Sequence, residues 1–292
     1  MFGYQISKSN CLDLLQNNDI KISVVIPTFN RRNDLMRAID SVRKQSFPVH
    51  EILICDDGSN DGSQEAVLAL FVPMIKWIPC GKNGGPAIPR NVGIEKSTGN
   101  WIAFLDSDDI WYEKKLELQV AQIRKHGCKF VCTNADRIIE GKNHGAYLNF
   151  EGKTIDLVHL MRQNSVICSS VLVEKNLLLN TSLFPIEKHL VALEDFALWM
   201  RLATKNDLRY ISEPLVGYND NASVSIRSNL QVDSWTVYDL ITKDFKSWLK
   251  KSKASLTTEQ KKEFKALTIR VKYKGLPSPW QNFKNRIKRI FK

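Results

Sequence analysis

Residues 101–111 read Trp-Ile-Ala-Phe-Leu-Asp-Ser-Asp-Asp-Ile-Trp, and the fold can be worked out from this stretch outward. The apolar run 101–105 is typical of a buried strand. It is followed directly by the carboxylates of Asp106, Asp108 and Asp109. Carboxylates this close raise one another's pKa, and a hard divalent cation relieves their repulsion. The stretch is therefore a candidate cation site; an acidic loop that caps a helix is the alternative.

The chain around this stretch alternates between predicted strands and predicted helices. The spacing of apolar residues predicts strands at 22–26, 51–55, 74–78, 101–105 and 129–133, and helices at 32–45, 63–71, 87–96 and 114–126. Alternation of this kind predicts an α/β fold, in which right-handed crossovers join a mostly parallel sheet and helices flank both of its faces.

Polar clusters follow three of these predicted strands, at 28–30, 56–59 and 106–109. In open parallel sheets, ligands bind beyond the carboxyl ends of the strands. We therefore expect one site that joins the three clusters. The glycines at Gly84 and Gly85 lack the spacing of a dinucleotide-binding fingerprint, and a Walker lysine loop is absent. A bound nucleotide would thus be held by carboxylates and a metal.

Beyond residue 135 the periodicity is weaker, with mixed apolar segments at 154–163 and 170–180. Glu194 and Asp195 then open a strong predicted helix at 196–204. Acidic residues suit the positive end of a helix, so capping is an alternative to a chemical role for this pair. From residue 236 onward the sequence is helical and basic.

The composition is that of a soluble globular protein, with 292 residues, 43% hydrophobic and 25% charged. There is no apolar run of about 20 residues and no secretory signal in the first ten, so we expect a cytoplasmic protein. The six cysteines are scattered. Cys128 and Cys132 are spaced like half of a zinc site, but no second pair matches them, so we expect neither zinc nor disulfides.

Positive charge is concentrated at the carboxyl end. Residues 231–292 carry 16 of the 42 Lys and Arg residues but 5 of the 31 acidic ones, so they account for the whole net charge of +11. The neutral body argues against a nucleic-acid groove. Residues 280–292 are predicted to form a short helix with apolar and basic side chains, which is typical of a segment that binds an anionic membrane surface. A solvated or dimer-packed helix is the alternative.

Five motifs together resemble the family 2 inverting glycosyltransferases, which use nucleotide-diphosphate sugars and have the GT-A fold. The motifs occur in the family's order over residues 21–225. They are residues 23–31 (SVVIPTFNR), 56–63 (DDGSNDGS), 84–91 (GGPAIPRN), 104–109 (FLDSDD) and 194–199 (EDFALW).

The resemblance implies roles for individual residues. Pro27 and Phe29 match positions that flank the nucleotide base, and Asp57 matches the carboxylate that accepts a hydrogen bond from it. For Asp57 and its neighbour Asp56, turn chemistry before a glycine is the alternative. Arg90 matches a basic residue near the donor, with a solvated helix face as the alternative.

The remaining matches concern the donor sugar and the chemistry. Asp106 matches the contact to the donor ribose and Asp108 the ligand of Mn²⁺ or Mg²⁺. Asp195 matches the catalytic base, with Glu194 as its neighbour. The resemblance also places four further residues in the donor site, namely Thr28, Arg31, Gly85 and Ser107.

One segment departs from the family pattern. Many members have a Tyr-Arg-x-His segment after the base helix, whereas this chain reads Tyr218-Asn219-Asp220-Asn221 there, and no His or Arg occurs before Arg227. In some members the His of this segment is an extra metal ligand, and Asp220 is a candidate replacement for it.

Taken together, these features predict a GT-A domain at 21–230 between an N-terminal extension (1–20) and a basic helical region (231–292). The expected activity is metal-dependent inverting transfer from a nucleotide-diphosphate sugar, most simply a UDP-sugar, to a hydroxyl of a saccharide or lipid-linked saccharide. Such transfer occurs in the synthesis of cell-surface polysaccharides, and we expect the protein on the inner face of the cytoplasmic membrane. The alternatives are a non-catalytic sugar-nucleotide-binding scaffold and a nucleotidyltransferase.

Overall fold

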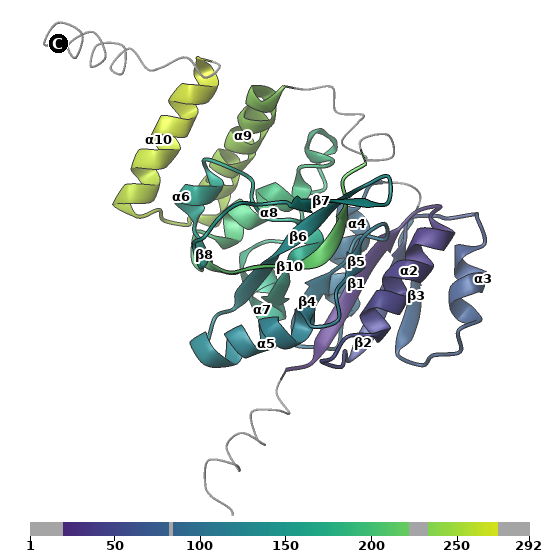
Figure 1. Cartoon of the computed structure of the whole chain (residues 1–292). Helices are drawn as coiled ribbons and strands as arrows, with labels where there is room; N and C mark the ends of the chain where they lie inside the picture. The colour runs from purple at the N-terminus through teal and green to yellow at the C-terminus, as the bar shows by residue number, and fades with distance from the viewer. Residues whose placement is uncertain (1–19, 82–83, 222–232, 274–292) are drawn as a thin grey trace, which may run out of the picture.

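The structure is a computed structural model that describes residues 20–81, 84–221 and 233–273. Its centre is one mixed sheet (Figure 1), whose main path runs β3-β2-β1-β4-β9-β6-β10-β5. These strands are β3 (Ile75–Pro79), β2 (Glu51–Asp56), β1 (Ile22–Thr28), β4 (Trp101–Phe104), β9 (Leu172–Glu174), β6 (Phe130–Ile139), β10 (Leu208–Asn219) and β5 (Ile110–Trp111). Two short strands lie off this path: β7 (Lys142–Ala146) pairs with β6, and β8 (Thr154–Ile155) pairs with β10.

The first four strands are parallel, as the sequence predicts. β1 pairs in parallel with both β2 and β4, and β2 with β3. β9 is the main exception, since it runs antiparallel to both β4 and β6. Mixed sheets of this kind are common in α/β proteins. The prediction of an α/β fold with flanking helices is confirmed, and the sheet is mixed, since β5, β7, β8 and β9 all pair antiparallel to their neighbours. Strand β6 extends six residues beyond its predicted end.

Helices cover both faces of the sheet (Figure 1). Side chains of α2 (Arg32–Arg43), α3 (Ser63–Leu68) and α5 (Lys115–His126) share one core cluster with Val24 and Ile26 of β1. Val25 points to the other face, where its cluster includes α4 (Ala87–Lys96), α7 (Lys175–Thr181) and α8 (Glu194–Leu202). A strand buried on both faces explains the continuous apolar run of β1. The helix α3 ends three residues before its predicted end.

The short helix α6 (Leu157–Leu160) and the 3-10 turns η1 (Cys168–Ser170) and η2 (Lys188–Leu190) complete the second half. These elements form the part of the chain in which sequence periodicity is weak. Each is too short to show a full helical repeat, which is why residues 154–180 give no clear pattern.

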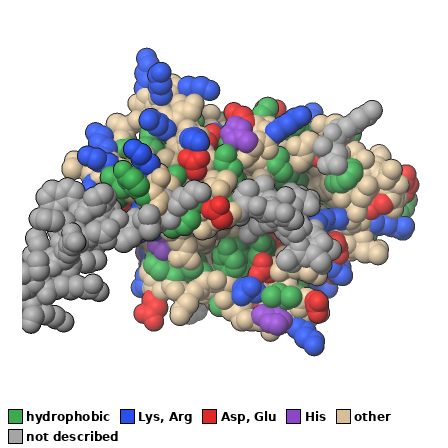
Figure 2. All heavy atoms as spheres, turned by 90° about the horizontal axis from the view of Figure 1, so that it is seen from above, with side chains coloured by type: hydrophobic (Ala, Val, Ile, Leu, Met, Phe, Trp, Pro, Cys, Tyr) green, Lys and Arg blue, Asp and Glu red, His purple; other side chains and the backbone are tan. Residues whose placement is uncertain are grey.

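Two long helices, α9 (Ser234–Ser252) and α10 (Thr258–Lys272), pack together beside α8. Asp233 caps α9, and Thr257 and Gln260 form a capping box at the start of α10. Ile241, Phe245 and Leu267 belong to the same core cluster as the centre of the second half. Among the described residues, no helix is long and apolar enough to cross a membrane. Figure 2 shows Lys and Arg side chains gathered over the end of the molecule where α9 and α10 lie.

Glu51, the first residue of β2, links neighbouring segments at the edge of the sheet where the parallel strands begin. Its Oε1 accepts hydrogen bonds from the Ser23 hydroxyl at 2.7 Å and from the Thr98 backbone N–H at 2.6 Å, and its Oε2 pairs with Lys76 at 2.7 Å. Burial disfavours the charged form, but these partners outweigh it and lower the pKa of Glu51 to about 2.

Candidate active site

A cavity of about 670 Å³ opens at the carboxyl edge of the parallel strands. Its size is typical of a small-molecule site. The structure brings every residue of the predicted site to its wall: Pro27, Thr28, Phe29, Arg31, Asp57, Gly85, Arg90, Asp106, Ser107, Asp108, Glu194 and Asp195. These residues come from the ends of β1 and β2, the loop before α4 and the first turn of that helix, the loop after β4, and the start of α8. The expected single site is therefore one cavity.

One end of the cavity is formed by the end of β1 and the loop after β2. Phe29 is 37% exposed, a high value for a phenylalanine, and offers its ring to a ligand. Asp57 is buried, and its Oδ2 accepts a hydrogen bond from the Gly85 N–H at 3.0 Å. Gly85 has a φ of 88°, which favours glycine. Asp56 carries out the turn chemistry considered above, since its carboxylate accepts from the Ser59 N–H. Asp57 instead fixes the wall of the cavity.

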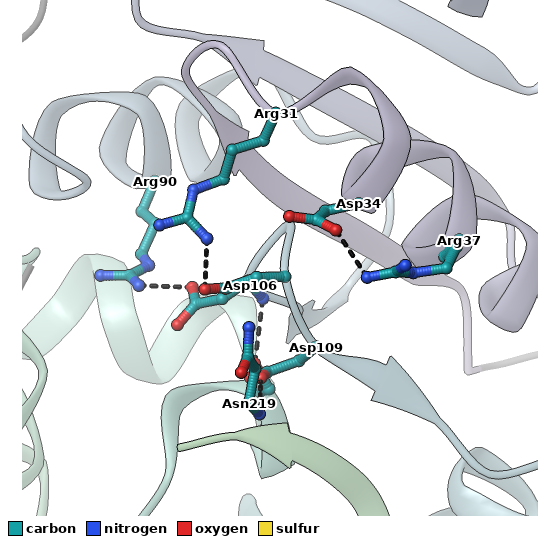
Figure 3. A network of polar contacts seen from close by, with 9 residues as sticks. Arg31, Asp34, Arg37, Arg90, Asp106, Asp109 and Asn219 are labelled. Carbon is teal, nitrogen blue, oxygen red and sulfur yellow. Dashed lines mark hydrogen bonds and ion pairs between the residues drawn. The ribbon is translucent and has the colours of Figure 1, made fainter. Parts of the chain in front are cut away.

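The three carboxylates after β4 have different surroundings. Asp109 is buried, and both of its oxygens are bonded: Oδ2 accepts from the Ser169 hydroxyl at 2.5 Å and Oδ1 from the Asn219 N–H at 2.8 Å (Figure 3). Burial and the charges of Asp108 and Asp106 raise its pKa well above the usual range. Asp109 therefore ties the loop to η1 and β10, and leaves the other two carboxylates to face a ligand.

Asp108 forms an ion pair with Arg31, which follows β1. Burial raises the pKa of Asp108, the guanidinium of Arg31 opposes that effect, and Asp106 adds to it. A carboxylate whose proton affinity is raised in this way gains from a nearby cation. In this structure the cation is an arginine.

Arg90 connects two parts of the cavity wall. Its guanidinium is buried and donates from Nη1 to Glu194 Oε1 at 2.7 Å and from Nη2 to Asp106 Oδ1 at 2.5 Å. Burial opposes its charge, but Asp106 and Glu194 raise the pKa of Arg90 above its usual value. Figure 3 shows the guanidinium of Arg90 reaching the carboxylate of Asp106. The alternative of a solvated helix face is therefore wrong for Arg90.

Close packing of α4 on the sheet brings Arg90 to this position. A Cβ on Gly93, one turn after Arg90, would lie 2.4 Å from Cγ1 of Val25 in β1. Only glycine allows this approach. The glycine thus lets the helix come close enough for its arginine to reach the carboxyl edge of β4.

The pair Glu194 and Asp195 opens α8, as predicted, and both side chains are buried. The capping alternative does not account for Glu194, because its carboxylate is held by Arg90 and the N-cap residue is Leu193, whose side chain makes no cap hydrogen bond. Asp195 Oδ1 accepts from the Phe196 N–H at 2.6 Å. Within the described part of the chain, Glu194 Oε2 and Thr28 Oγ1 are buried atoms of the cavity wall without a hydrogen-bond partner. A buried polar atom without a partner costs free energy, which a polar ligand in the cavity would relieve.

The donor set limits how a metal can be held. In the described ranges, no cluster of three or more His, Cys, Asp or Glu side chains could enclose a metal ion. Magnesium-type sites commonly use one or two carboxylates together with substrate phosphates, and Asp106 and Asp108 fit such a site. Asp220 is engaged elsewhere, in an ion pair with Arg137 at 2.7 Å, and does not line the cavity. Its role as the replacement ligand considered above therefore stays a prediction.

Sequence reasoning missed part of the wall. Lys188, Val191 and Ala192 form the stretch before α8, and Ala192 has a φ of 64°. Ile167 and Cys168 approach from η1. The one signal in the sequence that could have indicated Lys188, Val191 and Ala192 is their position shortly before the Glu194–Asp195 pair.

Comparisons with known proteins agree on a family. The family model described as "Glycosyl transferase family 2" matches residues 23–172. An uncharacterized glycosyltransferase of Rickettsia conorii, RC0461, is 35% identical over 209 residues, which are 68% of this chain and 32% of that protein. The chain thus spans about a third of that relative.

A second relative is matched over more of its length. The Escherichia coli protein WfgD, named UDP-Glc:alpha-D-GlcNAc-diphosphoundecaprenol beta-1,3-glucosyltransferase, is 31% identical over 195 residues, 67% of this chain and 74% of that one. Among solved structures, S. aureus TarS 1-349 in complex with UDP-GlcNAc superposes with a TM-score of 0.69 at 22% identity, covering 86% of this chain and 72% of that chain. This likeness shows a shared GT-A fold.

Proposed function

The chain belongs to glycosyl transferase family 2, and on that premise we propose that it transfers a sugar from a nucleotide-diphosphate donor to a saccharide hydroxyl, with inversion at the anomeric carbon. The observation that carries the proposal is the shared cavity. Asp57 after β2, Asp106 and Asp108 after β4, and Asp195 on α8 all line it. In this proposal the nucleotide lies at the end with Asp57, the diphosphate lies near Asp106 and Asp108, and the acceptor lies at the end with Asp195.

In this proposal Asp195 is the general base. Its carboxylate removes the proton of the acceptor hydroxyl while that oxygen bonds to the anomeric carbon and the bond to the diphosphate oxygen breaks. The proton ends on Asp195, and the electron pair leaves with the nucleoside diphosphate. General-base assistance contributes about 10²–10⁴-fold. Because the transfer is a single displacement, it needs no nucleophilic side chain.

The donor is proposed to lie with its base between Pro27 and Phe29 and next to Asp57, and with its ribose at Asp106. Thr28, Gly85 and Ser107 complete this part of the wall. We expect a UDP-sugar, since WfgD is named for UDP-Glc and the TarS structure contains UDP-GlcNAc.

Asp108, assisted by Asp106, would hold Mn²⁺ or Mg²⁺. The cation would neutralise charge on the diphosphate oxygens when bound. Arg31, now paired with Asp108, would then donate to a phosphate oxygen, which a guanidinium does well. Arg90 keeps Glu194 and Asp106 in place on either side.

The acceptor is proposed to be a saccharide carried on a lipid, in the synthesis of a cell-surface polysaccharide. The name of WfgD includes such an acceptor, GlcNAc-diphosphoundecaprenol. A lipid-linked acceptor would lie at a membrane, and we propose that the enzyme works at the inner face of the cytoplasmic membrane. The predicted contact of residues 280–292 with an anionic membrane lies outside the described residues and stays a prediction.

A panel of nucleotide sugars with Mn²⁺, scored by thermal unfolding, tests the proposed function. A ligand at 100 times its Kd stabilises the folded protein by about 2.7 kcal/mol. We expect one UDP-sugar to stabilise the wild type, Asp57→Ala to lose that shift, and Glu95→Gln, an exposed change on α4, to keep it.

The product then separates the alternatives. With its acceptor, a glycosyltransferase releases a free nucleoside diphosphate, whereas a nucleotidyltransferase releases inorganic diphosphate. Binding without release of either would indicate a non-catalytic scaffold. No shift with any nucleotide sugar would contradict the proposed donor site.

A further inference from the structure

The outer surface of α9 and α10 is covered with lysines. We define the lysine face as the exposed lysines of this helix pair and the turn between them: Lys243, Lys246, Lys250, Lys251, Lys253, Lys261, Lys262, Lys265 and Lys272. In Figure 2, Lys and Arg side chains gather over this end of the molecule. In the neutral body, by contrast, acidic and basic residues balance.

Acidic side chains on the same helices neutralise little of this charge. Asp244 is turned inward, where it binds Arg201, and Glu263 pairs with Arg162 and Arg270. Asp239 pairs with Lys243 at 2.6 Å. Of the acids on α9 and α10, Glu259 is the one that is exposed rather than partly buried. Most of the lysine charge is therefore available to a partner.

Packing does not explain the lysines. Lys243, Lys246 and Lys250 recur with helical spacing along one side of α9, and Lys261 and Lys265 do so along α10. The opposite sides of these helices supply the buried apolar residues. Crowded like charges on one side destabilise the fold slightly. Binding to an anionic partner would explain why this surface carries so many lysines despite that cost.

The lysine face is joined rigidly to the cavity wall. Arg201 of α8 donates from Nη2 to both carboxylate oxygens of Asp244 of α9, each at 2.8 Å, and both side chains are about 90% buried. On the same pair of helices, the rings of Phe196 and Tyr238 meet edge to face with centroids 6.0 Å apart. Because α8 begins with Glu194 and Asp195, whatever binds the lysine face is held at a fixed position relative to the cavity.

We propose that the lysine face docks on an anionic phospholipid surface. Each lysine near such a surface adds to the electrostatic attraction without needing a pocket. Nucleic-acid recognition favours arginine forks, whereas the exposed basic residues of this face are lysines. The choice of a lipid surface rests on the proposed function, because a lipid-linked acceptor would lie at that surface. Docking would present the cavity to the acceptor. This contact is electrostatic and belongs to the folded helix pair.

Sedimentation of the full chain with lipid vesicles tests the proposal. The probes are vesicles of phosphatidylglycerol with phosphatidylcholine, and of phosphatidylcholine alone, at low and high salt. The test variant is Lys246→Glu/Lys250→Glu/Lys265→Glu. The matched control is Lys114→Glu/Lys125→Glu/Lys142→Glu, which makes the same change in net charge at exposed positions away from α9 and α10. Thermal unfolding confirms that both variants fold.

We expect wild type to bind the anionic vesicles and to be released by high salt, because surface charges are screened. The test variant should lose at least tenfold in binding and the control less than twofold. Binding of the test variant at the wild-type level, or equal losses in both variants, would overturn the proposal. So would displacement of the protein from vesicles by equimolar single-stranded DNA. Donor-induced thermal shifts are read separately, so a failure here leaves the nucleotide-sugar site untouched.

Discussion

Arg90 and Glu194, which are 104 residues apart in sequence, meet in a buried ion pair with a 2.7 Å contact between Nη1 and Oε1. Each side chain is 4% exposed. The second nitrogen, Nη2, reaches Asp106, so one guanidinium joins α4, α8 and the loop after β4. Arg90 thus positions both the proposed donor-binding loop and the start of the helix that carries the proposed general base.

Removing this support should destabilise the fold. We expect Arg90→Met to lower the free energy of unfolding by about 3–5 kcal/mol, because it leaves buried carboxylates unpaired. Adding Glu194→Gln should recover part of the loss, with a coupling of about 1 kcal/mol or more. Chemical denaturation measures both. Arg37→Met is the control, since it breaks the exposed pair with Asp34 and should cost less than about 1 kcal/mol. Equal costs at the two arginines would show that the buried pair adds nothing.

Asp108 should govern any metal dependence. In wild type, Mn²⁺ should increase the thermal shift produced by the donor, and EDTA should abolish transfer. Asp108→Ala should bind the donor equally with and without Mn²⁺, because the carboxylate that holds a hard cation is gone. Calorimetric titration of donor in the two conditions gives the comparison. Full activity in EDTA would rule out a metal mechanism.

Glu51 should stabilise the fold in a pH-dependent way. Its folded pKa of about 2 lies below the ordinary value of 4.5, so its contribution is fully present above pH 4.5 and is lost as the pH falls toward 2. We expect Glu51→Gln to cost roughly 3 kcal/mol at pH 7 and progressively less at pH 4 and pH 3. The exposed Glu95→Gln is the control. A cost independent of pH, measured by urea unfolding, would show that the charge of Glu51 is irrelevant.

Residues 280–292 are predicted to add an apolar membrane contact. A chain that ends at Leu276 should bind anionic vesicles less tightly than the full chain, and the loss should persist at high salt, since it includes apolar burial. Sedimentation with the same vesicles gives the comparison. Equal partition of the two chains would show that the tail is not an anchor.

The arrangement of the first half could be predicted from the sequence because each of its elements shows its own local pattern. The run 101–105 gives β4, and the apolar spacing at Leu35, Ile39 and Val42 gives α2. The carboxyl-edge rule then places the clusters after β1, β2 and β4 together. The family resemblance supplied the rest of the predicted cavity wall, including Asp195.

Long-range contacts could not be predicted in this way. No local pattern shows that Arg90 would be buried between Asp106 and Glu194, or that Asp220 would be taken up by Arg137. Lys188 was missed because η2 is a three-residue turn with no periodicity. Pairings of this kind depend on how α4, α8 and β10 pack, which is a property of the whole fold.

The central claim is that Asp195 removes the proton of the acceptor hydroxyl, and Asp195→Asn tests it most directly. The variant keeps the size of the side chain and its ability to accept a hydrogen bond from the Phe196 N–H. With the donor and acceptor identified, single-turnover transfer and the donor Kd are measured side by side. We predict that transfer slows by about 10²-fold or more while the donor Kd changes less than about threefold. Transfer near the wild-type rate, at unchanged donor affinity, would contradict the account.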